Sequence, residues 1–419
     1  MALSMLTFEE LRKQTQLLFL IPLACLGILY IAIKVLVIPD IGPHDHIDFQ
    51  DIWLAAKIWV SGKSPYDGTL FPNAERLSTW FYPPYWYPLV VPFGLLPFST
   101  ALGIWKVINF SLLIGATYLI ARVLADVAHK HFMPIFLAGT AFACFMHATP
   151  DAIWVGQTSV IVYFGLATLI FGLLKARPIF LIVGLLLLAL KPQIGVIAFA
   201  AVLPLYRYRW TVIPPAVICL LATAAITITA DFRVSVEGFL ANLGRHADHA
   251  SNSLTHLTGL LHILYYTLGI SSGLLSTVLA LFPAVLCTVV VFYISPLNKK
   301  IRKTEDTPQT VASLALFVAT IFFFIPLHNY DMVGLVALLM MIIAVSLRGR
   351  WLIALGLLIC FRPEYLGRTL SKATLPEVNE AHFISLGLLL LWVGCVWALS
   401  ATRSHTTLPA RQKSGYRIS

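Results

Sequence analysis

Three carboxylates gather in one polar stretch, Asp45-His46-Ile47-Asp48-Phe49-Gln50-Asp51, directly after the first long apolar run. Only 11% of the chain is charged, so this cluster stands out. A carboxylate within hydrogen-bond reach of an attacking hydroxyl accepts its proton, which is general base catalysis. Asp48, Asp51 and Asp45 are therefore candidates for a base. The same acids have a structural interpretation, which suits Asp51 in particular, because a carboxylate at a helix start caps the helix or favours its dipole.

A lysine interrupts two neighbouring apolar runs, in Leu190-Lys191-Pro192-Gln193. An ammonium group at membrane depth is costly, so Lys191 requires an anion. Two kinds of anion remain open: a substrate phosphate, or a buried carboxylate such as Asp151 or Asp331. Arg245, in a polar segment, carries the planar fork that suits phosphate, although a loop arginine is more often solvated.

Two further motifs lie at the ends of apolar runs. His328-Asn329-Tyr330-Asp331 follows one of them, and ionisable groups beside a membrane span are functional hypotheses by default. His328 suits donation to a phosphate or orientation of a carboxylate; the alternatives are a backbone-bonded histidine and, for Asp331, an N-cap. Gly156-Gln157 opens another run, where glycine allows close helix packing and glutamine bonds across helices.

The histidines also raise the question of a metal. His44 with His46, and His246 with His249, have ligand-like spacings, but the chain contains no HExxH or CxxC motif. We therefore expect no metal. There is also no Walker loop, GxGxxG or GxSxG, so nucleotide-driven transport and serine hydrolysis lack their usual marks.

The elements that must position these residues are apolar helices. The chain has 419 residues, 59% of them hydrophobic, and a mean hydropathy of +0.85, which indicates an all-α polytopic integral membrane protein. We expect a single domain over 1–401 with a first run retained as an anchor, and a cytoplasmic basic tail over 402–419. About 10–12 spans are expected, at roughly 15–38, 97–121, 132–149, 154–174, 178–190, 192–206, 211–230, 272–296, 310–327, 332–347, 351–361 and 382–401.

Three of these runs, 178–190, 192–206 and 351–361, are shorter than the roughly 17–25 residues that cross a bilayer. Pro192 interrupts the first two, since proline lacks a backbone donor and ends a helix. Broken backbone at membrane depth is tolerated where it is buried in protein or lines a watery cavity. We therefore expect an outward-facing cavity with Lys191 at its floor or wall.

Two longer polar segments, 39–96 and 231–270, are expected on the outer face, with amphipathic helices and interfacial aromatic residues. Most Lys and Arg residues then fall in inner loops, which favours an even number of spans with both termini cytoplasmic. The net charge of +10 is explained by this bias; no basic run is interleaved with stacking aromatics, so we expect no nucleic acid. All six cysteines lie in apolar runs, so no disulfide framework is expected.

Taken together, the motifs resemble the polyprenol-phosphate-sugar-dependent glycosyltransferases of family 87, of the GT-C type. The resemblance covers about residues 45–335, and each motif is short; the order and spacing make the match specific. The matching pieces are Asp48-Phe49, Trp53, Ala55-Ala56, Gly62, Ser64-Pro65-Tyr66-Asp67, Tyr82-Pro83-Pro84, Gly156-Gln157, Leu190-Lys191-Pro192-Gln193, Pro326 and His328-Asn329-Tyr330-Asp331.

The resemblance implies a GT-C-like bundle and an inverting transfer of one sugar from a polyprenyl-phosphate carrier to an envelope glycolipid or polysaccharide acceptor. It places the enzyme in the bacterial inner membrane, with the active site facing the periplasm. Asp48 occupies the place of the general base, with Asp51, Asp45 and Tyr66 as supporting residues. The resemblance requires neither a cofactor nor a divalent metal. Residues expected to bind the donor phosphate or sugar are Lys191, His328, Arg245, Gln157, Gln193, Tyr82 and Asp331. The sequence does not rank Arg245 against Arg362 and Arg368 as contacts of the phosphate.

One departure bears on the sugar. The chain has His-Asn-Tyr-Asp at 328–331, where some mannosyl members carry a tryptophan and paired histidines. The sugar is therefore left as mannose or a related hexose or pentose.

Two other classes of function are compatible with the composition. A transporter or flippase also has broken helices and a charge at membrane depth, but it usually carries internal repeats, and none is visible here. A scaffold subunit of an envelope assembly has no need of buried charge. The outer segment with its interfacial aromatics suits acceptor docking better than alternating access.

Overall fold

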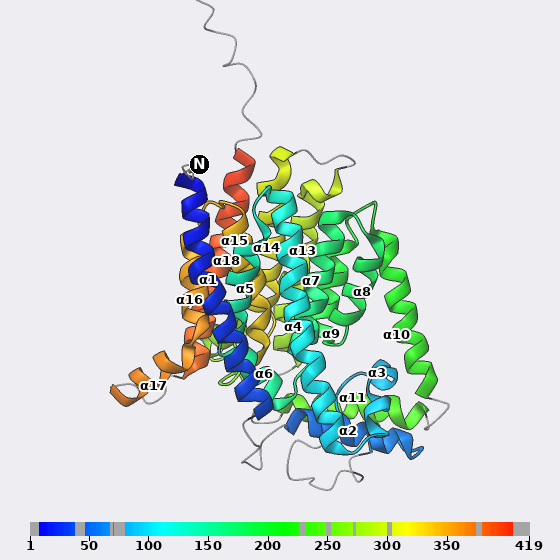
Figure 1. Cartoon of the computed structure of the whole chain (residues 1–419). Coiled ribbons are helices and arrows are strands. Elements are labelled where there is room, and N and C mark those ends of the chain that lie inside the picture. Colours follow the sequence, from blue (N-terminus) through cyan, green and yellow to red (C-terminus); the bar gives the residue numbers. More distant parts are fainter. Residues whose placement is uncertain are drawn as a thin grey trace, which may run out of the picture.

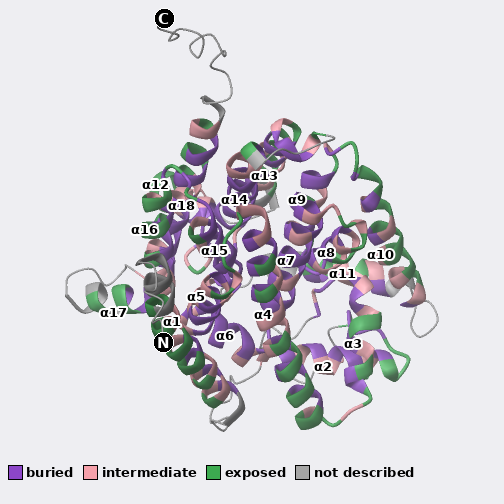
Figure 2. Cartoon of the chain, turned by 45° about the horizontal axis from the view of Figure 1, so that its top comes forward, coloured by how far each residue is buried: buried purple, intermediate pink, exposed green. Residues whose placement is uncertain are grey.

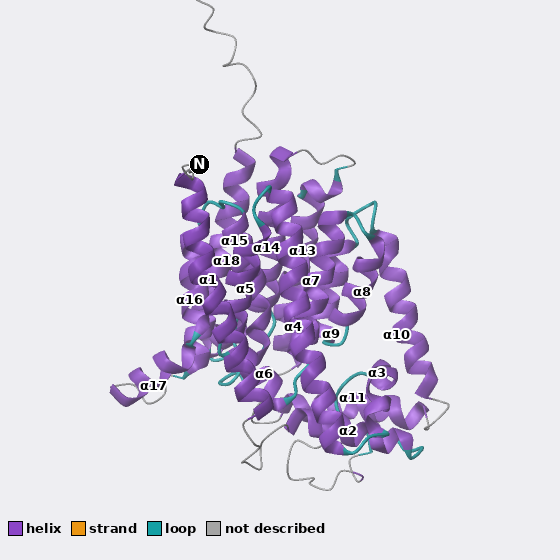
Figure 3. Ribbon diagram, in the orientation of Figure 1, coloured by secondary structure: helices purple, strands orange, loops and turns teal. Residues whose placement is uncertain are grey.

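The computed structural model describes residues 8–37, 47–67, 70, 80–226, 232–248, 253–270, 274–299, 304–373 and 379–404. Throughout these ranges the chain is helical and contains no strand; one isolated bridge pairs Thr258 with Leu327. Figure 3 shows helices of different lengths side by side in one bundle. The all-α polytopic membrane fold is confirmed.

Within the described ranges, four stretches of long helix are apolar enough to cross a bilayer, and a bent pair of helices makes a fifth if it counts as one span. They belong to α1 (Phe8–Ala32, continued by a π turn at Ile33–Val37), α4 (Phe98–Ala128), α14 (Thr307–Phe324) and α18 (Glu380–Ser404). The expected 10–12 spans also count shorter apolar helices, so that number remains a prediction.

The expected span 132–149 corresponds to α5 (Phe132–Phe145) and reaches only the first two residues of α6 (Ala148–Val155). The two helices meet at an angle of 61°. Pro150 lies in the first turn of α6, where its missing N–H is tolerated, but it cannot donate to the carbonyl of Met146 four residues earlier. Met146 is accordingly extended, with ψ at 133°, and the helix ends there.

The short apolar runs are short helices, as expected. Pro178–Leu188 forms α8, Pro192–Val202 forms α9 and Arg350–Phe361 forms α16. The remaining helices within the bundle are α7 (Ser159–Lys175), α10 (Ile213–Ala225), α13 (Leu274–Ile294) and α15 (Val336–Ala344), with 3-10 turns at Arg209–Val212, Pro296–Asn298, Thr304–Asp306 and Asn329–Leu335.

The two outer segments form helices at one end of the bundle. Figure 1 shows α2 (Ile47–Val60), α3 (Tyr87–Gly94) and α11 (Phe232–Asp248) at the end opposite to the start of α1 and the end of α18. The first of these two segments, 39–96, also contains a 3-10 turn, Pro84–Trp86. Two additional helices are α12 (Leu260–Leu268) and α17 (Pro363–Ala373), and α17 extends away from the bundle. The sequence analysis did not predict α17.

The centre of the bundle is α7 with α14. All residues of α14 from Thr310 to Phe324 are buried, whereas α10 and α13 expose apolar side chains such as Leu220 and Phe282 (Figure 2). An apolar exterior of this kind is the surface that lipid contacts.

A second apolar cluster lies under the outer helices. It contains Phe49, Ile52 and Trp59 of α2, together with Trp80 and Trp86. Helix α3 approaches α2 so closely that a Cβ on Gly94 would lie 2.5 Å from the backbone carbon of Ala56. A glycine is therefore required at this crossing.

We predict that Gly94→Ala forces α3 away from α2 and lowers the free energy of unfolding by about 1–3 kcal/mol, the usual cost of overpacking. The measurement is the unfolding midpoint of the purified protein in detergent. Gly103→Ala is the matched control, because a Cβ at Gly103 meets nothing within 4 Å and alanine favours the helix. A Gly94→Ala midpoint equal to that of Gly103→Ala would contradict the close packing.

Candidate active site

Asp48 lies in the first turn of α2. The helix begins at Ile47, and its dipole favours an acid in the first turn. Phe49, Ile52, Ala55, Ala56 and Trp59 form the buried face of α2. Asp48 and Asp51 are half-buried beside it, one helical turn apart.

The Asp48 carboxylate meets an amide from a distant part of the chain. Gln157 Nε2 donates to Asp48 Oδ2 over 2.7 Å and lies 3.3 Å from the hydroxyl oxygen of Tyr330. An ionised carboxylate only accepts hydrogen bonds, so it is the amide nitrogen that faces Asp48. The predicted residues Asp48 and Gln157 are thus in direct contact.

Lys191 meets a carboxylate, the second of the two anions that the sequence left open. Its ammonium group forms an ion pair with Asp331 Oδ1, and the two side chains are only 10% and 5% exposed. Ser159 Oγ donates to the same oxygen over 2.5 Å. Asp331 Oδ2 accepts from the backbone N–H of His328 at 3.3 Å. The ring of Tyr330 lies 5.7 Å from the ammonium nitrogen and links this pair to Gln157.

The break that carries Lys191 is held by aromatic side chains from the outer segment. Tyr85 donates to the carbonyl of Ala189 over 2.5 Å, and Trp86 donates to that of Leu190 over 3.1 Å. These are carbonyls at the end of α8 that lack helical partners. The 3-10 turn of the outer segment therefore positions Lys191 by satisfying the backbone next to it.

Burial raises the pKa of Asp48 to about 6, against the opposing effects of the Gln157 hydrogen bond and the charge of Lys191. Burial raises the pKa of Asp51 to about 7, and the charge of Asp48 adds to this effect. Asp48 is thus mostly ionised at neutral pH and able to accept a proton, whereas Asp51 is about half protonated. Two neighbouring acids of this kind titrate as a pair.

The other tyrosines predicted for the site are buried in the outer segment. Tyr66 donates to the backbone carbonyl of Tyr82 over 2.7 Å and accepts from Trp80 at 3.2 Å. The ring of Tyr82 lies 4.2 Å from that of Trp86, centroid to centroid. Burial and the nearby charges of Asp48, Asp51 and Asp331 raise the pKa of Tyr82. The charges of the three acids therefore act on Tyr82, and Tyr66 holds the Tyr82 backbone through its hydrogen bond.

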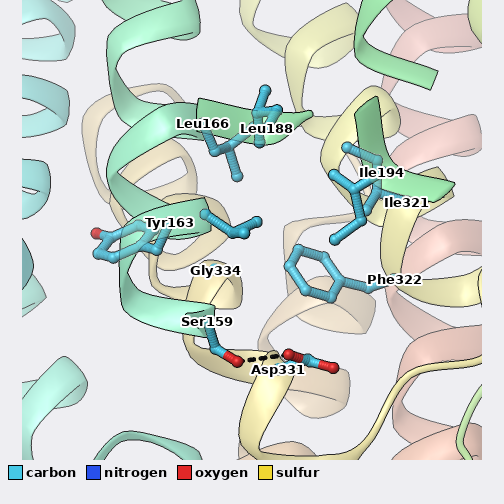
Figure 4. A pocket seen from close by; sticks show the side chains of 10 residues that line it. Ser159, Tyr163, Leu166, Leu188, Ile194, Ile321, Phe322, Asp331 and Gly334 are labelled. Carbon is cyan, nitrogen blue, oxygen red and sulfur yellow. Dashed lines mark hydrogen bonds between the residues drawn. The ribbon is translucent and has the colours of Figure 1, made fainter. Parts of the chain in front are cut away.

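A cavity lies next to the ion pair, on the side of the bundle core (Figure 4). Ser159 and Asp331 are its polar lining, and the rest consists of glycine, aliphatic and aromatic residues. Lys191 does not line it; its partner Asp331 does. The watery, outward-facing cavity expected from the broken helices therefore remains a prediction.

A separate charged cluster surrounds His147, between α5 and α6. His147 Nε2 lies 3.0 Å from Asp151 and 3.8 Å from Glu380, and Nδ1 lies 3.5 Å from Glu364. Lys34 is 3.7 Å from Asp151, so Asp151, the other carboxylate considered for Lys191, is paired here instead. The described residues contain no group of histidines, cysteines and acids arranged to hold a metal. The cluster links α1, α6, α17 and α18.

The remaining predicted residues are placed less centrally. His328 stacks on Tyr330 with 5.0 Å between ring centroids, and burial lowers its pKa to about 4, so the imidazole is neutral at pH 7. Gln193 is half-buried in the first turn of α9. Arg362 pairs with Glu364 at 3.2 Å.

Several predicted residues cannot be placed against the site. Asp45, His44, His46 and His249 lie outside the described residues. Arg245 and His246 are in α11 and Arg368 is in α17, but their side chains are outside the described part of the chain.

Two residues of the site were not predicted. Tyr330 was named only as part of the motif at 328–331, and Ser159 was not singled out at all. Their signals are weak, because a tyrosine and a serine at helix ends are common; contact with Gln157 and Asp331 depends on the packing of distant helices.

We predict that Lys191→Met lowers the free energy of unfolding by about 3–5 kcal/mol, because Asp331 is left buried without its partner. Adding Asp331→Leu to Lys191→Met should restore most of this loss. Unfolding in detergent measures both. The control is Lys175→Met, which breaks a pair with Asp126 whose two side chains are 33% and 32% exposed, and should cost at most about 1 kcal/mol. A double variant as unstable as Lys191→Met alone would contradict the pairing.

The arrangement combines a half-buried carboxylate, ionised at neutral pH, with a buried ion pair connected to it through Gln157 and Tyr330. Such a site can remove a proton from a hydroxyl and stabilise negative charge nearby. The sequence model of glycosyltransferase family 87 matches residues 80–326, more than half of the chain. Asp48 and the motif at 328–331 lie outside the matched residues. Among curated protein sequences there is no significant match. The chain belongs to glycosyltransferase family 87.

Proposed function

We propose that this glycosyltransferase moves a single sugar from a polyprenyl-phosphate carrier to an envelope glycolipid or glycan, with Asp48 as the general base. The observation that carries the proposal is the half-buried Asp48 carboxylate, which accepts a hydrogen bond from Gln157 and is linked through Tyr330 to the Lys191–Asp331 pair. The sugar is mannose or a related hexose or pentose.

The reaction is a single displacement. An acceptor hydroxyl forms a bond to the anomeric carbon of the donor, and its proton passes to Asp48. The bond between the anomeric carbon and the phosphate oxygen breaks, and the phosphate departs on the lipid with the electron pair. One displacement inverts the anomeric configuration. No nucleotide or metal takes part in this scheme, since the lipid phosphate is the leaving group.

The charge that develops on the phosphate requires nearby cations or donors. Lys191 is a cation whose charge lowers the pKa of Asp48, and it is held by Asp331. A phosphate in the site would compete with Asp331 for this ammonium group. Neutral His328 can still donate one ring N–H, and we propose Gln193, Tyr82, Asp331 and Arg245 as further contacts of the donor.

A lipid-linked donor approaches from the bilayer. Exposed apolar side chains on α10 and α13 provide a surface along which a prenyl chain can lie, including Ile213, Val217, Leu221, Leu279 and Leu286. We propose that α2, α3 and α11 face the periplasm in a bacterial inner membrane. The start of α1 and the end of α18 lie at the other end of the bundle (Figure 1), which fits the proposed cytoplasmic location of both termini.

We predict that Asp48→Asn lowers the rate of transfer from a synthetic polyprenyl-phosphate sugar by at least about 10²-fold, the usual range for loss of a general base. Product mass gives the rate, and the unfolding midpoint reports on the fold. Asp126→Asn is the matched control, because Asp126 pairs with Lys175 at 2.7 Å outside the site. Full activity of Asp48→Asn would move the base to Asp51 or Asp45.

The rate of transfer should also depend on pH. Because burial raises the pKa of Asp48 to about 6, the carboxylate is protonated below that pH and cannot accept a proton. We therefore expect kcat/KM, which reports the pKa of the free enzyme, to rise as pH increases through about 6. A kcat/KM profile that is flat between pH values of about 5 and 7 would contradict a base with this pKa.

A further inference from the structure

The turn before α7 places the side-chain amide of Gln157 against the Asp48 carboxylate. Gly156 ends α6 with φ at +81°, and a Cβ there would lie 2.3 Å from Phe49 Cβ in α2. This left-handed conformation favours glycine. Trp105 donates to the Gly156 carbonyl over 3.0 Å, and the Gln157 N–H donates to Ala152 over 2.8 Å. The backbone on both sides of the Gly156–Gln157 bond is thus fixed against α2.

This geometry leaves the Gln157 amide little freedom. The residue is 5% exposed, and Nε2 has two N–H groups, one within reach of Asp48 Oδ2 and the other near the Tyr330 hydroxyl. A hydrogen bond to a charged acceptor is stronger than an ordinary hydrogen bond. The amide therefore holds one defined oxygen of the carboxylate.

We propose that Gln157 is a positioning residue for the base: it fixes Asp48 Oδ2, so that Oδ1 faces the acceptor hydroxyl, and it favours the ionised carboxylate. The inference rests on the proposed role of Asp48. It also assigns to Gln157 a task different from binding the donor sugar.

Other groups also act on Asp48, but they do so through their charges, whereas Gln157 acts through a hydrogen bond. Asp51 lies on the same helix, Lys191 attracts the carboxylate, and Asp331 repels it. Burial raises the pKa of the hydroxyl groups of Tyr330 and Tyr82, and the charge of Asp48 also acts on both and raises the pKa of each further. Of these groups only Gln157 has a direct hydrogen bond to Asp48 among the described residues. Its removal should act on Asp48 even though the charged groups stay in place.

The test is the titration of Asp48 itself, followed by infrared difference spectroscopy of the purified protein without substrate. The band of the protonated carboxyl group that is absent in Asp48→Asn belongs to Asp48. In Gln157→Met, which keeps the length of the side chain and removes both N–H groups, we expect the midpoint of this band to rise by about one pH unit. Gln193→Met is the matched control and should leave the midpoint unchanged.

An unchanged midpoint in Gln157→Met would overturn the proposal. If that variant does not fold, Gln157→Asn replaces it, because a side chain shorter by one methylene group withdraws the amide from Asp48. Transfer assays then separate the two claims. An infrared shift without any transfer by the wild-type protein contradicts the proposed function and leaves the contact intact, whereas wild-type transfer with no shift contradicts only the positioning role. In an active enzyme, the rise of kcat/KM with pH should move upward together with the infrared midpoint.

Discussion

The site depends on how an apolar bundle accommodates Lys191. An ammonium group among apolar helices has to be paired, and Asp331 and Ser159 provide its oxygens. The pairing joins three separate parts of the chain: the break between α8 and α9, the start of α7 and the 3-10 turn after α14. Tyr330 stands next to Asp331 in that turn, so the ion pair also fixes the ring that meets Gln157. The charged groups thereby order the helix ends around Asp48.

The outer helices complete this arrangement from the other side. Helix α2 presents Asp48 through its first turn and packs its apolar face on α3 and the tryptophans. The donors on Tyr85 and Trp86 satisfy carbonyls at the helix break. The same short segment therefore shields the carboxylate, which raises its pKa, and supports the backbone that carries the lysine. Membership of a glycosyltransferase family is compatible with the proposed use of Asp48 as a general base.

Much of the fold was predictable, because apolar runs and prolines act locally. The short helices α8, α9 and α16 follow from run length and from Pro192. The bend between α5 and α6 was missed, although His147, Pro150 and Asp151 interrupt the apolar run there. In the site, the sequence identified Asp48, Gln157, Lys191 and Asp331 as separate candidates. The sequence could not show which carboxylate pairs with Lys191 or that Gln157 contacts Asp48. Both contacts join residues more than 100 positions apart. Periodicity contains no information about such contacts.

The most direct test of the proposed chemistry is a screen of polyprenyl-phosphate sugars against the purified protein, with products read by mass. The account predicts that one class of lipid-linked sugar is consumed, that its sugar appears on an acceptor with inverted anomeric configuration, and that polyprenyl phosphate is released in equal amount. Absence of transfer from every donor, together with counterflow of a labelled substrate across reconstituted vesicles, would contradict the account and favour a transporter.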